Sequence, residues 1–163
     1  MISVARRVAL VPPAALSVLM LAGVFWPLFP HDPVFKRLIV AVGVMLVAFP
    51  LCGWTWAVYV VASCRKNRPS TFNPRRWIFI LPPLIGVGGA LAGLPLQNSP
   101  TAALFFLTLL IALWSAAKAL EEVDGKPPIS AIYETAMLMF FTPIGAWVLR
   151  PTVLRAVDLG SGQ

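Results

Sequence analysis

Charged residues are scarce in this chain. Only 12% of its 163 residues are Asp, Glu, Lys or Arg, whereas 59% are hydrophobic. A soluble domain carries roughly 25% charged residues, so this chain has too little polar surface to cover a globule in water. The shortage excludes an ordinary soluble protein, because the remaining surface must face lipid. The composition predicts an all-α integral membrane protein with a single transmembrane domain over residues 1–163.

Histidine and cysteine are also rare. The single histidine, His31, excludes a metal site built on paired histidines and an H-E-x-x-H helix. Cys52 and Cys64 stand 12 residues apart in one predicted helix, about 18 Å along its axis, which is too far for a disulfide. No phosphate-binding glycine loop and no nucleophile elbow occurs in the sequence. We therefore predict no catalytic residue, no metal and no cofactor, and hence not an enzyme.

Acids and bases are missing from the interior of the apolar runs. Transporters that couple to ions usually place such groups inside their spans, so this absence argues against ion-coupled transport and intramembrane hydrolysis. The polar groups at depth are neutral, and we expect each to bond its own helix backbone or a neighbouring helix. They are Ser17, Thr55, Tyr59, Thr108 and Ser115.

Four apolar segments have the length of a membrane span, which is about 20 residues. They cover residues 8–29, 38–64, 77–96 and 101–118. No small-residue cleavage site follows the first, so it is predicted as an uncleaved helix. The second is long, which predicts tilt or a kink at Pro50. The third and fourth are joined by a short uncharged connector and should form an antiparallel hairpin.

A fifth apolar segment, residues 132–149, is harder to assign. Its 18 residues would span about 27 Å as a helix, and Pro143 and Gly145 interrupt it before Trp147, Arg150 and Pro151. We expect a re-entrant or interfacial arm that returns to the cytoplasm, with five full spans as the alternative. Glu134 is expected near the start of its helix, where a negative charge is favoured. The tail 158–163 is predicted to be disordered.

The positions of Lys and Arg indicate the orientation. With the N-terminus in the cytoplasm, the count is nine inside to four outside if the last segment crosses, and eleven to two if it returns. Positive residues favour the inside, so the returning arm is preferred. The net charge of +7 therefore reflects topology rather than nucleic-acid binding, because the basic residues flank apolar runs.

Two further features suggest interactions. The loop "RKNRPSTFNPRR" concentrates Arg65, Lys66, Arg68, Arg75 and Arg76, which either only set the topology or also hold anionic lipid head groups. Glu121, Glu122 and Asp124 are expected on the same side and are able to pair with this loop. In segment 77–96, Gly86, Gly89 and Gly93 have small-residue spacing typical of helix packing, either within the subunit or between copies.

The C-terminal half resembles a pattern in small bacterial four-helix membrane proteins of uncharacterised function. The resemblance is carried by an alanine-lysine-x-leucine helix end, a later tyrosine and a closing Phe-Phe-x-Pro-Ile-Gly-x-Trp-x-x-x-Pro motif. The matching residues are Ala117, Lys118, Leu120, Tyr133, Phe140, Phe141, Pro143, Ile144, Gly145, Trp147 and Pro151. This resemblance implies a location in the bacterial inner membrane and no known activity.

The expected function is a non-enzymatic inner-membrane interaction or accessory subunit that is able to self-associate. Its partner would be another membrane protein or anionic lipid, contacted through the basic loop and the C-terminal arm. The alternative is a lipid- or small-molecule-handling membrane protein, such as a channel, sensor or exporter subunit.

Overall fold

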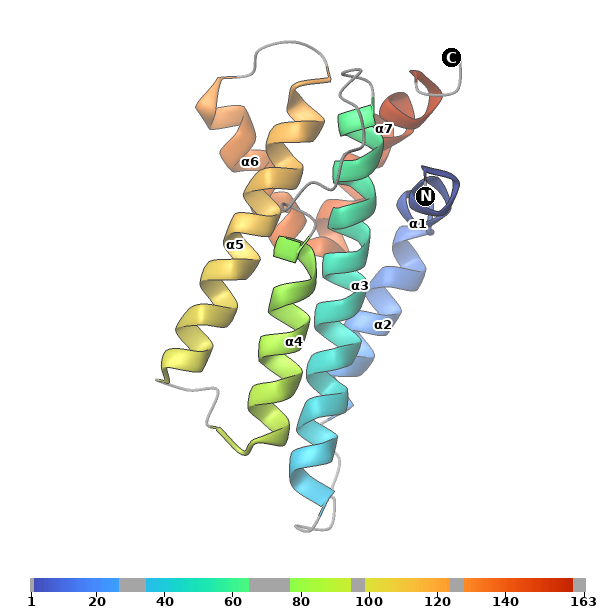
Figure 1. Ribbon diagram of the computed structural model, residues 1–163. Helices are drawn as coiled ribbons and strands as arrows, with labels where there is room; N and C mark the ends of the chain where they lie inside the picture. Colours follow the sequence, from blue (N-terminus) through green and yellow to red (C-terminus); the bar gives the residue numbers. More distant parts are fainter. Residues whose placement is uncertain (1, 27–34, 65–76, 95–98, 124–127, 160–163) are drawn as a thin grey trace.

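The regular structure of the protein is entirely helical in the part that the computed structural model describes, residues 2–26, 35–64, 77–94, 99–123 and 128–159 (Figure 1). This confirms the predicted all-α class. In chain order the helices are α1 (Ile2–Ala9), α2 (Pro13–Phe25), α3 (Lys36–Cys64), α4 (Trp77–Leu91), α5 (Pro100–Glu121), α6 (Ile129–Phe140) and α7 (Thr142–Leu159).

Helix α3 is the centre of the bundle. It has 29 residues, about 43 Å of helix, and continues through Pro50. Helices α1, α2, α4, α5 and α7 all pack against it. Its Ala57 and Val58 are buried, and α5 contributes the buried alanines Ala112 and Ala116 to the same core. Small side chains at these positions let the helix backbones approach closely.

The first predicted span, 8–29, is not one helix. The chain bends by 75° between α1 and α2, and α2 begins at Pro13 and ends at Phe25. Pro12 and Pro13 are the physical reason, because a residue before proline avoids the α conformation, whereas proline itself suits the first turn of a new helix. Leu10 N–H and Val11 N–H close the end of α1 on the carbonyls of Arg6 and Val8.

Fewer helices than the four predicted are long and apolar enough to cross a membrane. Within the described residues, α3 and α5 meet both criteria, and the bent pair α1–α2 would add a third if it acts as one span. Helices α4 and α6 are apolar but shorter, with 15 and 12 residues. Length and composition are thus compatible with a membrane protein that has two or three spans.

Helices α4 and α5 form the antiparallel hairpin predicted for 77–96 and 101–118 (Figure 1). Helix α4 stops at Leu91, because Gly93 has a φ of 71°. Leu94 N–H then bonds the carbonyl of Gly89 and Gly93 N–H that of Ala90, as in a helix end that reverses direction at glycine. Ser99 caps the start of α5 by accepting from Ala102 N–H, and α5 extends to Glu121.

The predicted arm, 132–149, is a pair of helices that is longer than expected. Helix α6 begins at Ile129, so Glu134 lies in its second turn, and the expectation of an acid at the helix start is wrong. Helix α7 continues through Pro151 to Leu159, so the tail predicted as 158–163 begins with two helical residues. Residues 160–163 lie outside the described part of the chain.

The break between α6 and α7 is at Phe141, whose φ and ψ are −87° and 50°. Pro143 follows in the first turn of α7, where a missing N–H costs nothing, so this proline begins a helix rather than interrupting one. Ile144 N–H and Gly145 N–H both bond the carbonyl of Phe141. The Thr142 hydroxyl, which is fully buried, donates to the carbonyl of Met139.

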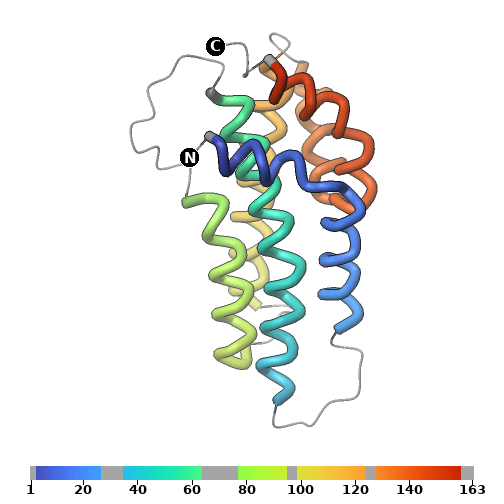
Figure 2. Tube along the Cα trace, turned by 90° about the vertical axis from the view of Figure 1, so that its right-hand side faces the viewer, coloured from blue at the N-terminus to red at the C-terminus, as the bar shows by residue number. Residues whose placement is uncertain are grey.

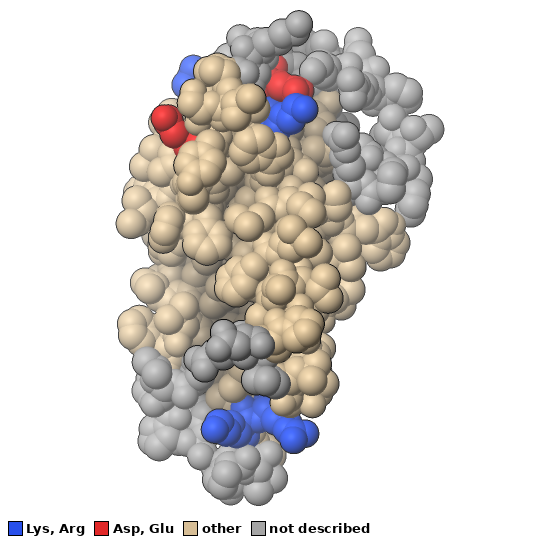
Figure 3. Space-filling view, turned by 90° about the vertical axis from the view of Figure 1, so that its left-hand side faces the viewer, with Lys and Arg blue, Asp and Glu red and all other residues tan. Residues whose placement is uncertain are grey.

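Helix α1 and the C-terminal end of α7 lie at the same end of the bundle, which we call the termini end (Figures 1 and 2). Helix α6 runs away from this end and α7 runs back to it, while α1 lies across the bundle axis. The start of α3, with Lys36 and Arg37, is at the opposite end. Figure 3 shows one face of the described chain with charged side chains at its two ends and neutral surface between them.

We predict that Gly145→Ala destabilises the turn between α6 and α7. A Cβ at this position would collide with the backbone carbonyl of Leu138, which is unable to move without opening the turn. Overpacking of this kind costs about 1–3 kcal/mol, and thermal unfolding in a mild detergent measures the loss. The control is Gly53→Ala in α3, where a Cβ meets no atom within 4 Å and the substitution should stabilise by about 0.5–1 kcal/mol. Equal unfolding midpoints for the two variants would contradict this assignment.

Candidate functional site

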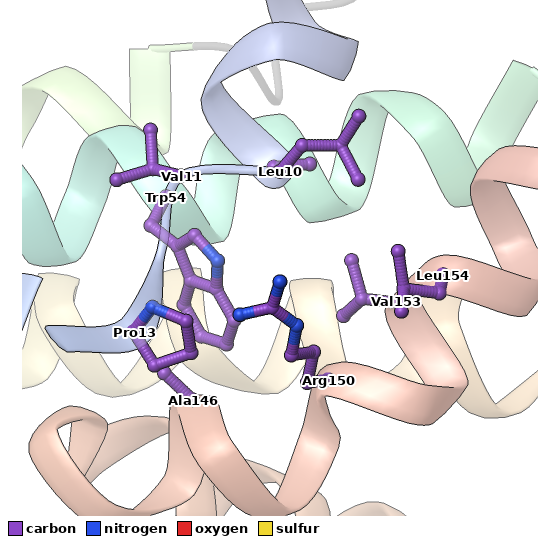
Figure 4. A pocket seen from close by; sticks show the side chains of 9 residues that line it. Leu10, Val11, Pro13, Trp54, Ala146, Arg150, Val153 and Leu154 are labelled. Atoms are coloured by element: carbon purple, nitrogen blue, oxygen red, sulfur yellow. The ribbon is translucent and has the colours of Figure 1, made fainter. Parts of the chain in front are cut away.

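A small cavity lies between the α1–α2 bend and the middle of α7. It has a volume of about 20 Å³ and is enclosed by the α1–α2 bend, α3 and α7 (Figure 4). This is room for one water-sized group. Its two polar side chains are Trp54 from α3 and Arg150 from α7. The full lining consists of Ala9, Leu10, Val11, Pro13, Trp54, Ala146, Arg150, Val153 and Leu154.

Trp54 and Arg150 point into this cavity from different helices (Figure 4). The Trp54 side chain is only 3% exposed, whereas Arg150 is exposed at the surface. No described residue accepts a hydrogen bond from the Trp54 indole N–H. Within the described part of the chain, every side-chain nitrogen that is fully shielded from solvent has a hydrogen-bond partner, so the indole nitrogen is not fully shielded. The indole nitrogen is therefore open to the cavity, and a guanidinium group lies beside it.

A hydrogen bond holds the two breaks together next to the cavity. The Ser17 hydroxyl in α2 lies 2.9 Å from the carbonyl oxygen of Pro13 and 3.1 Å from that of Pro143 in α7. These oxygens belong to the first turns of the two helices. The contact fixes the start of α7 against the start of α2, and so it positions Arg150 two turns further along.

A second, larger cavity lies between α3 and α4. Its volume is about 300 Å³, and it is lined by Phe49, Cys52, Gly53, Trp56, Phe79, Ile80 and Pro83. Gly53 leaves open space where a side chain would stand. The lining is almost entirely apolar, so this cavity suits a hydrocarbon group and offers no acid, base or pair of donors for chemistry.

The neutral polar residues at depth behave largely as predicted. The hydroxyls of Thr55, Thr108 and Ser115 donate to carbonyls three or four residues earlier in their own helices. Ser17 bonds its own helix and a neighbouring one. The Tyr59 ring packs on Phe79 with centroids 5.3 Å apart. Three of these groups therefore satisfy helix backbone, and Ser17 joins two helices.

The glycines predicted to pack helices have two different roles. A Cβ on Gly86 would lie 2.8 Å from Val44 Cγ1 in α3, and one on Gly89 would lie 2.9 Å from Thr101 Cγ2 in α5. Both residues are therefore buried between helices of the same chain. Gly93 is past the end of α4, where its positive φ ends the helix and the Arg37 guanidinium lies close to its Cα.

Two of the three acids predicted near the basic loop, Glu121 and Glu122, have partners in α6 and α5. Glu121 accepts a hydrogen bond from the buried hydroxyl of Thr135, which ties α5 to α6. Glu122 lies 4.0 Å from Lys118 one helical turn earlier, and both side chains are partly exposed, so this pair adds little stability. Arg65, Lys66, Arg68, Arg75 and Arg76, as well as Asp124, are outside the described residues.

The residues predicted for the C-terminal arm are separated by the fold. Pro143 and Gly145 form the start of α7, Trp147 faces outward, and Arg150 enters the cavity. Sequence reasoning missed Trp54, because nothing in the local pattern of α3 distinguishes it from Trp56, which lines the other cavity. Within the described residues, no three His, Cys, Asp or Glu side chains gather as metal ligands would.

Comparison of the chain with protein families, with curated proteins and with solved structures finds no match. The functional assignment therefore depends on the geometry of the two cavities and of the α6–α7 hairpin.

We predict that Gly86→Ala destabilises the single subunit by about 1–3 kcal/mol, because the new methyl group overpacks the contact with Val44 and Phe105. The loss should not depend on protein concentration, since the contact lies within one chain. Gly88→Ala is the matched control, because a Cβ there meets no atom within 4 Å. Thermal unfolding of both variants over a wide range of protein concentration measures the effect, and a concentration-dependent loss for Gly86→Ala would instead place the glycine between copies.

Proposed function

We propose that this chain is a multi-pass protein of the bacterial inner membrane and acts as a non-enzymatic accessory or interaction subunit. Its C-terminal hairpin, α6 and α7, contacts a membrane partner, and its basic loop and Arg150 contact anionic lipid. The observation that carries this proposal is the outward apolar face of the hairpin.

That face begins at the break and follows α7. Phe141, Ile144, Trp147 and Val148 are each more than half exposed, while Gly145, Ala146 and Leu149 between them are buried. The exposed positions follow helical spacing, so they form one continuous stripe. A contiguous apolar stripe of this kind is typical of a surface that another protein or a membrane covers. Its buried side packs on α2 and α3, which holds the stripe in a fixed orientation.

A topology with four spans and a returning hairpin accommodates this arrangement. Helix α4 packs against both α3 and α5, so a bilayer that contains the two long helices also contains α4 despite its length. The termini end is assigned to the cytoplasm, because Lys36 and Arg37 alone among the 13 Lys and Arg then lie outside. The hairpin enters from the cytoplasmic side and returns to it.

The packing of α4 bears on self-association. Gly86 and Gly89 are occupied by contacts with α3 and α5 of the same chain, so pairing of two copies through α4 is not supported. We assign any homo-oligomeric contact to the exposed stripe of α7 instead.

The cavity between α3 and α4 favours one second candidate, a protein that handles lipid or small apolar molecules. Its volume of about 300 Å³ is at the lower end of the range for ligand pockets. Gly53→Leu would fill this cavity and Gly88→Leu, on open surface, would not. If cells that carry Gly53→Leu show a defect and cells that carry Gly88→Leu do not, the lipid-handling candidate is favoured over the accessory subunit.

We predict that single cysteines report the proposed topology in a background without Cys52 and Cys64. An impermeant thiol reagent applied to intact spheroplasts should label Leu94→Cys, which is exposed at the end opposite the termini. It should label Ser3→Cys, Ser130→Cys and Ser161→Cys only after permeabilisation. External labelling of Ser161→Cys would show that the last segment crosses the membrane.

We predict that a photoreactive benzoyl-phenylalanine in place of Trp147 forms a discrete protein adduct in cells. The control position is Leu84 in α4, which is also more than half exposed but lies on a helix that packs mainly against α3 and α5. It should give no discrete adduct. Gel mobility and mass spectrometry identify the product. Absence of adducts at both positions, or ion leakage from liposomes that contain only this protein, would contradict the accessory role.

A further inference from the structure

The cavity between the α1–α2 bend and α7 has the features of an anion site. We infer that it binds the phosphate group of an anionic phospholipid, with Arg150 and the Trp54 indole N–H as its donors. This inference rests on the proposed function, because it requires the termini end to lie at the membrane surface.

Two side-chain donors converge on the cavity. Arg150 supplies a guanidinium group, and guanidinium suits phosphate because its planar donors match two phosphate oxygens. The Trp54 indole N–H is open to the cavity although only 3% of the residue is exposed. Pro13, the first residue of α2, also lines the cavity, but as a proline it has no backbone N–H to donate to an anion.

The opposing charge at the cavity is weak. Helix α1 ends there, and the C-terminal end of a helix is negative. This helix has only eight residues, and Arg6 and Arg7 stand in its last turn. Two of its end carbonyls, those of Arg6 and Val8, are already occupied by Leu10 N–H and Val11 N–H. No acid lines the cavity among the described residues, so an anion meets no carboxylate at this site.

The surroundings favour a lipid over free phosphate. The volume of about 20 Å³ holds one oxygen-sized group, so a phosphate would insert one oxygen and leave the rest of the molecule outside. Leu10 and Leu154 line the cavity and are exposed apolar side chains. A phospholipid is able to place its phosphate on Arg150 and its acyl chains along these leucines. Inorganic phosphate gains nothing from the apolar rim.

Native mass spectrometry of the full chain in mild detergent tests this inference, with dioleoyl phosphatidylglycerol as the probe. Arg150→Gln should weaken the affinity for this lipid by about tenfold or more, because a charge-assisted hydrogen bond is lost. Trp54→Phe removes the N–H but keeps an aromatic ring and should weaken the affinity by about 3–5-fold. Arg155→Gln, on the same helix but outside the cavity lining, should change it by less than about twofold.

Two further measurements identify the kind of phosphate that binds and show whether planar guanidinium donors are needed. Dioleoyl phosphatidylcholine should bind at least about tenfold more weakly than the anionic lipid, and inorganic phosphate should not compete. Arg150→Lys keeps the charge without the planar donors and should fall between the native protein and Arg150→Gln. Equal effects of Arg150→Gln and Arg155→Gln, or full competition by inorganic phosphate, would overturn the inference.

A separate control distinguishes this inference from the proposed function. Arg150→Gln should keep the native unfolding midpoint, the cysteine-labelling pattern and the adduct at position 147. Loss of lipid affinity alone then isolates the site. If instead the variant binds the anionic lipid as the native protein does while topology and adduct are unchanged, the lipid site is wrong and the accessory role stands.

Discussion

Backbone groups that leave a helix in an apolar environment need another partner, and this constraint shapes the whole molecule. The chain interrupts its helices between α1 and α2 and again between α6 and α7, and the helices that follow these breaks, α2 and α7, pack on each other. The Ser17 hydroxyl bridges the carbonyls of Pro13 and Pro143, which belong to opposite sides of this contact. The polar cavity with Trp54 and Arg150 lies beside it because freed backbone groups and polar side chains gather where helices are broken.

Helix α3 packs against α1, α2 and α7, the helices on the two sides of this contact. It presents one face to α1, α2 and α7 and another to α4 and α5, so two cavities of opposite character lie on its two sides. Trp54 lines the polar cavity and Trp56 lines the apolar one, two positions apart on one helix. With this separation, a polar contact in one cavity and a hydrocarbon contact in the other would be independent of each other.

Much of the fold could be predicted from composition and segment length, and the prolines explain most of the rest. The segments 38–64, 77–96 and 101–118 correspond to α3, α4 and α5 within a few residues. A proline in an apolar run is able to continue, end or begin a helix: α3 continues through Pro50, whereas Pro13 and Pro143 begin α2 and α7. Tertiary contacts decide between these outcomes. For the same reason no local signal predicts that Trp54 and Arg150, which are distant in sequence, line the same cavity.

In the proposed topology, the order of residues along α7 restricts how deeply the hairpin enters the bilayer. Ile144, Trp147 and Val148 expose apolar surface near the break, at a cost in water of roughly 25 cal/mol per Å². Arg150 follows directly, and a charge in hydrocarbon is costly as well. Both costs are avoided at one depth, with the break in hydrocarbon and Arg150 among the head groups. At that depth α1, which lies across the bundle with Arg6 and Arg7, also reaches the interface. The cavity is then at the membrane surface without any rearrangement of the fold.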